Sequence, residues 1–348
     1  MSRINNTLRA IRPHLTQPSP TLTRHASTAP RIAIVGGGPG GLTLGRLLHK
    51  KQNPFTIFEF RPKPTAAELA KPSGMLDLHE ESGLAAIREC GVYDEFVPLI
   101  GECSEEFTVA DKTGTPAFTH NGQGERPEIS RNNLYKLLLA HIPEESVRWD
   151  HKLTASKTKN GVTELDFGEG RKEEFDFVVG ADGAWSRVRH LLTDARPNYA
   201  GVQTATITIR DITKKFPHLS KLVGSGSFTA LGNKQAVISQ RGPQDSSRIY
   251  LWLSTKDEQF GANSGVANRP ASEAKSEFLD KSEFLGSFGP KVKELVATAC
   301  DQESLDNPGS NLDIRPLYAL PYGSSWEHKK GVTLVGDAAH VMLPNGEG

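Results

Sequence analysis

A glycine-rich turn between a short apolar strand and a helix is the feature that most constrains this chain. Residues Arg31–Val35 are mostly β-branched and apolar, which is typical of a buried parallel strand. The next six, Gly36–Gly41, contain the spacing G-x-G-x-x-G, and a helical pattern follows over Leu42–His49. In such a turn the glycines permit a sharp bend, close approach of the backbone to a pyrophosphate, and close helix–strand packing. The helix N-terminus then directs unpaired N–H groups at the phosphates.

An acidic residue stands at the distance that a dinucleotide-binding unit requires. The second strand, Phe55–Phe60, contains Glu59, which lies 18 residues after Gly41. A carboxylate at this place hydrogen-bonds the ribose hydroxyls of the ligand. The glycine pattern alone is a weak signal, whereas strand, glycines, helix, second strand and acid in this order predict a nucleotide-binding unit. The unit leaves NAD and FAD both open, because each contains an ADP moiety.

Two later strands also end in glycine turns. Phe175–Gly180 leads to Asp182 and Gly183, and Val332–Val335 leads to Gly336 and Asp337. Ligands of open α/β sheets lie beyond the carboxyl ends of the strands. Three such ends, far apart in sequence, predict convergence on one long ligand. The alternative for either Gly-Asp pair is an ordinary turn, since both residue types are common there.

Length and composition exclude several classes of protein. The 348 residues suffice for two domains, and the formal net charge of zero gives no reason to expect nucleic acid as a partner. No apolar run approaches the roughly 18 residues of a membrane span. The three cysteines are far apart, at Cys90, Cys103 and Cys300, which argues against a disulfide framework or a redox pair. The eleven histidines show no metal-ligand spacing.

The first 30 residues differ from the rest in charge. The first acidic residue of the chain is Glu59, whereas arginines, serines and threonines are frequent before it. Ile4, Leu8, Ile11 and Leu15 share one face of a possible helix. An amphipathic, arginine-rich and acid-free leader is typical of mitochondrial transit peptides, and a disordered tail is the alternative. We therefore expect a mitochondrial or cytoplasmic protein, and exclude residues 1–30 from the fold.

The order of these motifs resembles the FAD-dependent aromatic hydroxylases, the para-hydroxybenzoate hydroxylase class of single-component monooxygenases. More closely, the chain resembles the tetracycline-inactivating flavin monooxygenases and their fungal relatives, over about residues 31–348. The motifs that carry the resemblance are G-x-G-x-x-G, Asp182-Gly183-x-x-Ser186-x-x-Arg189, Gly336-Asp337-Ala-Ala-His340, and the stretches 74–79, 127–134, 146–153 and 315–318.

The resemblance implies roles for single residues. Residues Gly36, Gly38 and Gly41 would hold the FAD pyrophosphate, and Glu59 the adenosine ribose. The flavin would be contacted by Asp77 and Arg131, the adenine by Leu153, and the ribityl chain by Asp337 after Gly336. Further roles fall on Asp182, which would bridge FAD and the nicotinamide cofactor, and on Lys71, a candidate for the NADPH phosphate. His340 is expected to be structural.

The predicted fold class is α/β, with a Rossmann-type FAD-binding domain and an antiparallel-sheet substrate domain. We expect residues 31–195 and 311–348 in the first domain and 196–310 in the second. In the second, four strand-like segments lie between residues 204 and 254, and two helices are expected over 272–288 and 291–300. The substrate candidates on this sheet are Phe228, Gln240, Tyr250 and Trp252, each of which has ordinary sheet packing as its alternative.

The chemistry implied by the resemblance is hydroxylation of an aromatic or polyketide-like small molecule. NADPH or NADH would reduce FAD, and O₂ would add to give a flavin C4a-hydroperoxide; no protein side chain is expected to act as a catalytic base. A flavin halogenase is disfavoured because its W-x-W-x-I-P segment is absent, and a disulfide reductase because a cysteine pair is absent. A ubiquinone-pathway-type flavin hydroxylase remains an alternative that would suit the leader.

The last residues raise a second alternative. In relatives the late Gly-Asp motif leads through a turn into a helix whose N-terminus points at the flavin, whereas this sequence ends at Gly348. We therefore expect the C-terminal helices to be missing. The alternative reading is a truncated, catalytically inactive remnant of such an enzyme.

Overall fold

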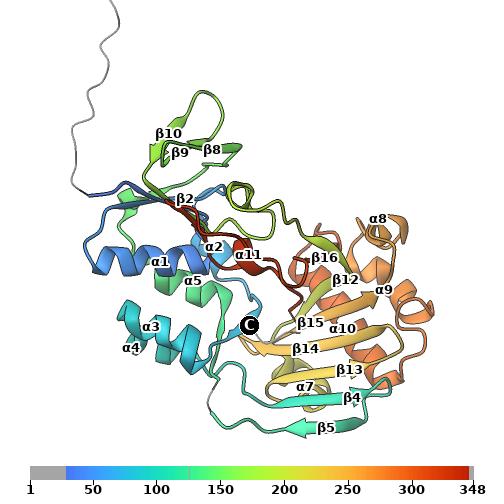
Figure 1. The fold of residues 1–348 in the computed structure, drawn as a ribbon. Helices are drawn as coiled ribbons and strands as arrows, with labels where there is room; N and C mark the ends of the chain where they lie inside the picture. Colours follow the sequence, from blue (N-terminus) through green and yellow to red (C-terminus); the bar gives the residue numbers. More distant parts are fainter. Residues whose placement is uncertain (1–28, 125, 345–348) are drawn as a thin grey trace, which may run out of the picture.

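Two large sheets organise the computed structural model, which describes residues 29–124 and 126–344. The first is a parallel sheet that carries the nucleotide-binding unit (Figure 1). Its strand order is β17-β11-β1-β2-β7, so strands far apart in sequence lie side by side at its centre. The strands are β1 (Ile32–Val35), β2 (Phe55–Phe58), β7 (Val147–Arg148), β11 (Phe177–Gly180) and β17 (Val332–Leu334).

Helices cover one face of this sheet and a small antiparallel sheet lies near its other face. The apolar side chains of β1 and β2 pack with those of the helices in one core, which includes Ile34, Leu42, Ile57 and Leu138. The helices are α1 (Pro39–Lys50), α3 (Ala85–Cys90), α4 (Tyr93–Phe96) and α5 (Arg131–Leu139). The small sheet consists of β8 (Ala155–Lys159), β9 (Val162–Asp166) and β10 (Lys172–Phe175).

The second large sheet has seven strands, in the order β16-β12-β15-β14-β13-β4-β5. Its four central strands, β12, β15, β14 and β13, are antiparallel neighbours, as we expected for the strand-like segments of the substrate domain. The strands are β4 (Phe107–Asp111), β5 (Pro116–His120), β12 (Asn198–Ile209), β13 (Ser227–Leu231), β14 (Gln235–Gly242), β15 (Ser246–Ser254) and β16 (Ile314–Ala319).

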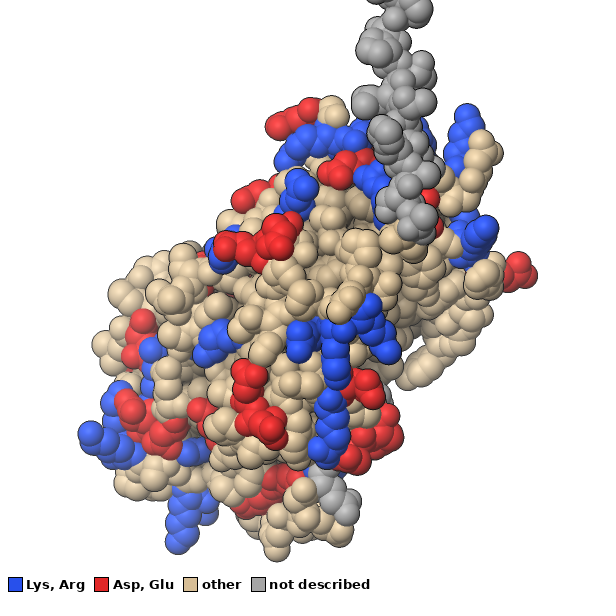
Figure 2. Space-filling model, turned by 90° about the vertical axis from the view of Figure 1, so that its left-hand side faces the viewer, with Lys and Arg blue, Asp and Glu red and all other residues tan. Residues whose placement is uncertain are grey.

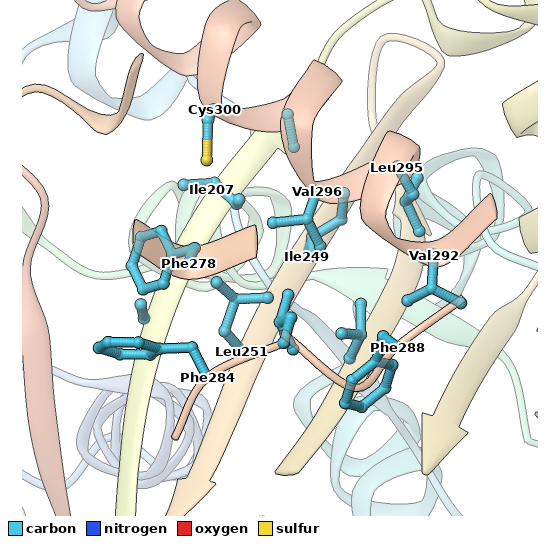
Figure 3. Close-up of a cluster of buried hydrophobic side chains, with 14 of the residues drawn as sticks. Ile207, Ile249, Leu251, Phe278, Phe284, Phe288, Val292, Leu295, Val296 and Cys300 are labelled. Carbon is cyan, nitrogen blue, oxygen red and sulfur yellow. The ribbon is translucent and has the colours of Figure 1, made fainter. Parts of the chain in front are cut away.

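One face of the seven-stranded sheet is buried under helices α9 (Ala271–Asp280) and α10 (Pro290–Asp306). Ile249 and Leu251 of β15 point toward Val296 of α10 in this core, and Phe278 of α9 lies beside them (Figure 3). Because side chains alternate along a strand, the residues between them face the opposite side. That opposite face is the one turned toward the parallel sheet and its helices (Figure 1).

The structure differs from the sequence-based expectations at three places, two of which concern the domain boundaries and one the end of a helix. Strands β4 and β5, which we expected in the FAD-binding domain, join the seven-stranded sheet through parallel pairing of β4 with β13. Strand β16 pairs with β12 in the same sheet. The helix expected over 272–288 ends at Asp280, and the chain then turns so that Phe284 and Phe288 insert into the core. Contacts between segments distant in sequence decided the strand pairing and the end of the helix. The residue pattern within a short stretch does not record such contacts.

The remaining elements are short. A two-stranded ribbon, β3 (Met75–Asp77) with β6 (Glu128–Ser130), connects the two large sheets. The other helices are α2 (Ala66–Leu69), α6 (Ile212–Lys215), α7 (Pro217–Val223), α8 (Phe260–Asn263) and α11 (Asp337–His340), with single turns at Glu80–Leu84, Val97–Leu99, Glu144–Ser146 and Arg189–Leu191.

The possible leader helix and the last residues, Asn345–Gly348, lie outside the described residues. Over the described ranges, no helix has both the length and the apolar character needed to span a bilayer. On the face that carries α1 and α3, lysines and arginines are interspersed with acidic side chains (Figure 2). This mixed pattern agrees with the balanced composition.

Candidate functional site

The glycine turn after β1 is shaped by two requirements, which fall on different glycines. Gly36 has a φ of +110°, and a Cβ placed on it would overlap the carbonyl oxygen of Ala181. A Cβ on Gly41 would overlap the carbonyl oxygen of Gly36. The packing of β1, α1 and the loop after β11 therefore demands glycine at both positions.

Gly38 is different, because a Cβ on it would meet nothing within 4 Å. It is the N-cap of the 12-residue helix α1, in extended conformation and with no side-chain cap, and no acidic residue lies in the first turn. The free N–H groups and the positive end of the dipole there form a site for an anion. The open space beside Gly38 fits a pyrophosphate group, which supports the sequence-based assignment.

Glu59 lies at the carboxyl end of β2 and is 6% exposed. Its carboxylate accepts hydrogen bonds from the backbone N–H of Gly37, at 2.7 Å, and of Arg61, at 3.1 Å. The first of these contacts fixes the glycine turn against β2. A carboxylate has about four acceptor positions, so capacity remains for the hydroxyls of a ribose.

The loop after β11 is organised by Asp182. One carboxylate oxygen accepts from the Ser186 hydroxyl at 2.5 Å, and the other from the backbone N–H of Arg187 at 2.7 Å. The spacing of Asp182, Gly183 and Ser186 thus encodes a closed turn. After Ser186 the chain forms only a single helical turn, Arg189–Leu191, because side chains hold the loop instead.

Arg189 connects this loop to the late Gly-Asp turn. It is 3% exposed and donates to the carbonyl oxygens of Ala184, Asp337 and Ala338 at 2.8–2.9 Å. Burial lowers the pKa of this arginine from its usual value, although guanidinium stays charged near neutral pH. Sequence reasoning quoted Arg189 only as part of a motif. Arg189 can connect the two turns because β11 and β17 are neighbouring strands, so that the loops after them lie together.

Asp337 begins helix α11 and is exposed, with no side-chain hydrogen bond from the described residues. Gly336 before it has a φ of +61° and open space where a Cβ would stand. The carboxylate of Asp337 is therefore available to a ligand. His340 is the last residue of α11 and is also exposed.

The ribbon β3–β6 brings Arg131, Asp77 and the substrate sheet close together. Arg131 follows β6 directly, and its backbone N–H donates to the carbonyl of Gly74 at 2.9 Å. A Cβ on Gly74 would lie 2.9 Å from the Tyr250 hydroxyl oxygen and 3.8 Å from Nε of Arg131. Gly74 thus allows Tyr250 of the substrate sheet to approach the predicted flavin residues.

Three of the four substrate candidates share one face of the seven-stranded sheet. Ile238 pairs with Tyr250, Ala236 with Trp252, and Gln240 with Arg248, so these side chains alternate with the buried ones. The fourth candidate is a correction. Phe228 pairs with Ser239 on the opposite face and is fully buried in the core with α9 and α10. Phe228 is therefore not a substrate-binding candidate, because the register of a strand, and not the type of residue, decides which face a side chain occupies.

Lys71 lines a polar cleft between the loop after α2 and the end of α10. Two adjoining cavities of about 260 and 560 Å³ share this residue with Arg210, Asp306, Asn307 and Ser310. Arg210 pairs with Asp306 at 3.4 Å. The smaller cavity also reaches Thr208 and Arg248, which lie on the same sheet face as Tyr250. The cleft therefore adjoins the face that carries the substrate candidates.

Leu153 is buried in the small core that joins the three-stranded sheet to the parallel sheet. It is 5% exposed and belongs to the same cluster as Phe58 and Phe167. A contact with the adenine stays a prediction. The residue packs behind β2, close in sequence to His151, whose backbone N–H donates to the Glu59 carbonyl at 2.9 Å.

Comparisons with known proteins identify the family of the chain. The family model for the FAD binding domain matches residues 30–281. Monooxygenase asqM of Emericella nidulans is 35% identical over 352 residues, covering 90% of this chain and 79% of that protein.

Two solved structures share the fold. HpxO of Klebsiella pneumoniae, complexed with FAD and uric acid, matches with a TM-score of 0.69 at 15% identity, over 90% of this chain and 74% of that one. The tetracycline destructase Tet(55) matches with a TM-score of 0.62 at 16% identity, over 90% and 75%. Both the glycine turn and the fungal relative lead to one conclusion: the chain belongs to the FAD-binding-domain family of flavoprotein monooxygenases of the aromatic-hydroxylase type.

Proposed function

We propose that this protein is an NADPH- or NADH-using monooxygenase that hydroxylates an aromatic or polyketide-like small molecule. The observation that carries the proposal is the approach of Tyr250, on the open face of the substrate sheet, to Gly74 and Arg131. A substrate on that face would lie beside the residues predicted to hold the flavin. The fungal relative named a monooxygenase supports the same reaction class.

The residues present fit FAD. Gly38 and the start of α1 would take the pyrophosphate, Glu59 the ribose, and Asp337 the ribityl hydroxyls. Arg131 and Asp77 would contact the flavin ring. When bound, FAD would supply the oxygen chemistry, in which a reduced donor and O₂ give one oxygen atom to the substrate and one to water.

The chain's own contribution is to position the substrate and to exclude water. Tyr250 and Trp252 offer flat, partly buried surfaces, on which an aromatic ring can pack. Gln240 is held by protein contacts, since its amide donates to Glu128 at 2.9 Å and accepts from the Met75 N–H at 3.4 Å. It would therefore shape the site more than bind the substrate directly.

The nicotinamide donor has a candidate entrance in the cleft at Lys71. Its wall carries three cationic side chains, Lys71, Arg210 and Arg248, against the two acidic ones of Glu303 and Asp306, and this excess of positive charge suits a phosphate group. We propose that Lys71 contacts the NADPH phosphate there, and that Asp182 lies between the donor and FAD.

The reaction is tested with purified protein, FAD and NADPH in the presence of ¹⁸O₂ and a panel of phenolic and polyketide-like compounds. We expect slow NADPH oxidation alone, faster oxidation with a substrate, and product that contains one ¹⁸O atom. Tyr250→Ala should abolish the stimulation by substrate while FAD remains bound. A panel that gives neither labelled product nor stimulated oxidation, from protein saturated with FAD, would contradict the proposal.

A further inference from the structure

A partly buried carboxyl group that the proposed reaction does not use lies where the ribbon meets the substrate sheet. Glu128 of β6 is directly opposite Asp77 of β3, so both side chains extend from the same face of the ribbon. Its Oε2 accepts from Nε2 of Gln240, on the neighbouring strand β14, at 2.9 Å. The connection thus crosses from the parallel-sheet half of the molecule to the substrate sheet.

Gln240 also contacts the other strand of the ribbon, β3. Its Oε1 accepts from the backbone N–H of Met75 at 3.4 Å, while its Nε2 donates to Glu128. The two contacts hold both strands of the ribbon, one through a side chain and one through the main chain. The ribbon carries Asp77 on β3, and Arg131 follows β6 directly.

We propose that Glu128 is a positioning residue, whose carboxyl group locks the β3–β6 ribbon to the substrate sheet through Gln240 and so places Asp77 and Arg131 for the flavin. The inference rests on the proposed roles of Asp77 and Arg131.

The groups that face Glu128 make its protonation state responsive near neutral pH. Burial, together with the negative charges of Asp77 and Glu105, raises the pKa of Glu128 to about 7. The thiol of Cys103 and the amide of Gln240 oppose this by hydrogen bonding. Arg241 faces Cys103 from β14, and burial raises the pKa of that thiol well above its usual range, so the thiol remains a donor.

The closed ribbon favours the neutral acid, because ionisation would place a further negative charge beside Asp77 and Glu105. The neutral carboxyl group keeps an acceptor oxygen for Nε2 of Gln240. When the ribbon opens, Glu128 meets water and its pKa returns toward 4.5, so raising the pH through 7 favours the open form. We therefore expect the ribbon to be held most firmly below pH 7. A partly buried carboxyl group with a raised pKa is also a common feature of functional sites.

The first test is hydrogen exchange of the ribbon amides, 75–77 and 128–130, in the protein without added FAD. In the wild-type protein we expect their protection, corrected for the intrinsic pH dependence, to fall about three- to tenfold between pH 6 and pH 8, as Glu128 ionises. Glu128→Gln should show no such fall. Glu145→Gln removes an exposed carboxylate of the same domain and should behave like the wild type.

The second readout is the FAD dissociation constant, measured by fluorescence titration at the same pH values. Wild type and Glu145→Gln should bind FAD about three- to tenfold more tightly at pH 6 than at pH 8, and Glu128→Gln equally at both. If Glu128→Gln fails to fold, Gln240→Leu breaks the same link and should give the same flat profiles. A fall in protection or affinity with rising pH that Glu128→Gln retains would overturn the proposal. Absence of substrate hydroxylation would instead count against the proposed function, because neither readout depends on turnover.

Discussion

The glycine turn after β1 and the open face of the seven-stranded sheet are two halves of one predicted site, and they are constructed differently. In the turn, the groups that we propose for the ligand are main-chain N–H donors, and side chains are absent where glycine is required. On the sheet, the groups that we propose for the ligand are side chains at every second residue, such as Tyr250 and Trp252. A substitution in the turn therefore changes the backbone, whereas one on the sheet changes a surface.

The largest effect is expected at Gly36. Alanine there would place a Cβ against the Ala181 carbonyl at a φ of +110°, so that backbone strain of about 1–3 kcal/mol adds to an overlap cost of about 1–3 kcal/mol. We expect Gly36→Ala to lower the free energy of unfolding in urea by about 5 kcal/mol. Gly38→Ala is the matched control, because its Cβ has open space. It should leave stability within about 1 kcal/mol and weaken FAD binding instead. Equal stability of the two variants would contradict the distinction between a glycine required for packing, Gly36, and one required for ligand binding, Gly38.

The next largest effect concerns the two faces of the substrate sheet. Phe228→Ala should cost about 4 kcal/mol of unfolding free energy, since the ring is fully buried against the helices. Tyr250→Phe, on the opposite face, should change stability by less than about 1 kcal/mol and should alter the response of NADPH oxidation to substrate. If Phe228→Ala were stable and altered substrate use, the assignment of faces would be wrong.

A smaller effect should develop as the pH is raised from about 5 to about 8. The pKa of Glu128 is raised from 4.5 to about 7 in the folded protein, so the native state holds this proton more tightly than the unfolded chain does. Stability then falls as pH rises from about 4.5 to about 7, by about 3 kcal/mol for this group. We expect the stability of Glu128→Gln relative to the wild type to increase by about that amount between pH 5 and pH 8. The relative stability of Glu145→Gln should stay constant, and a constant value for both would refute the pKa assignment.

The smallest effect separates ligand binding from folding in the turn. Glu59→Ala removes the acceptor for the Gly37 N–H and the predicted partner of the ribose, and should weaken FAD binding by about 2 kcal/mol. Glu59→Gln keeps an acceptor oxygen and should lose less. Both are measured by FAD fluorescence titration, and unchanged affinity in Glu59→Ala would exclude Glu59 from the site.

The sequence by itself determined the nucleotide-binding unit, because its constraints are local. Glycine at Gly36 and Gly41, an uncapped helix start and an acid after the second strand each have a short-range cause, and the structure places them together as expected. The strand-like segments between residues 204 and 254 also predicted the strands of the second sheet, because the tendency of a segment to form a strand is local.

Only the tertiary structure decided how the halves meet. Which face each strand turns to the ligand depends on pairing register, so Phe228 was misplaced although its strand was predicted. Three contacts join residues 100 or more positions apart. They are the pairing of β4 with β13, which brings β4 and β5 into the substrate sheet, the hydrogen bonds from Arg189 to the late Gly-Asp turn, and the hydrogen bond between Glu128 and Gln240. Neither segment in such a contact carries a local signal of its partner. Such contacts are chosen by the burial of surface across the whole fold, which no short stretch of sequence records.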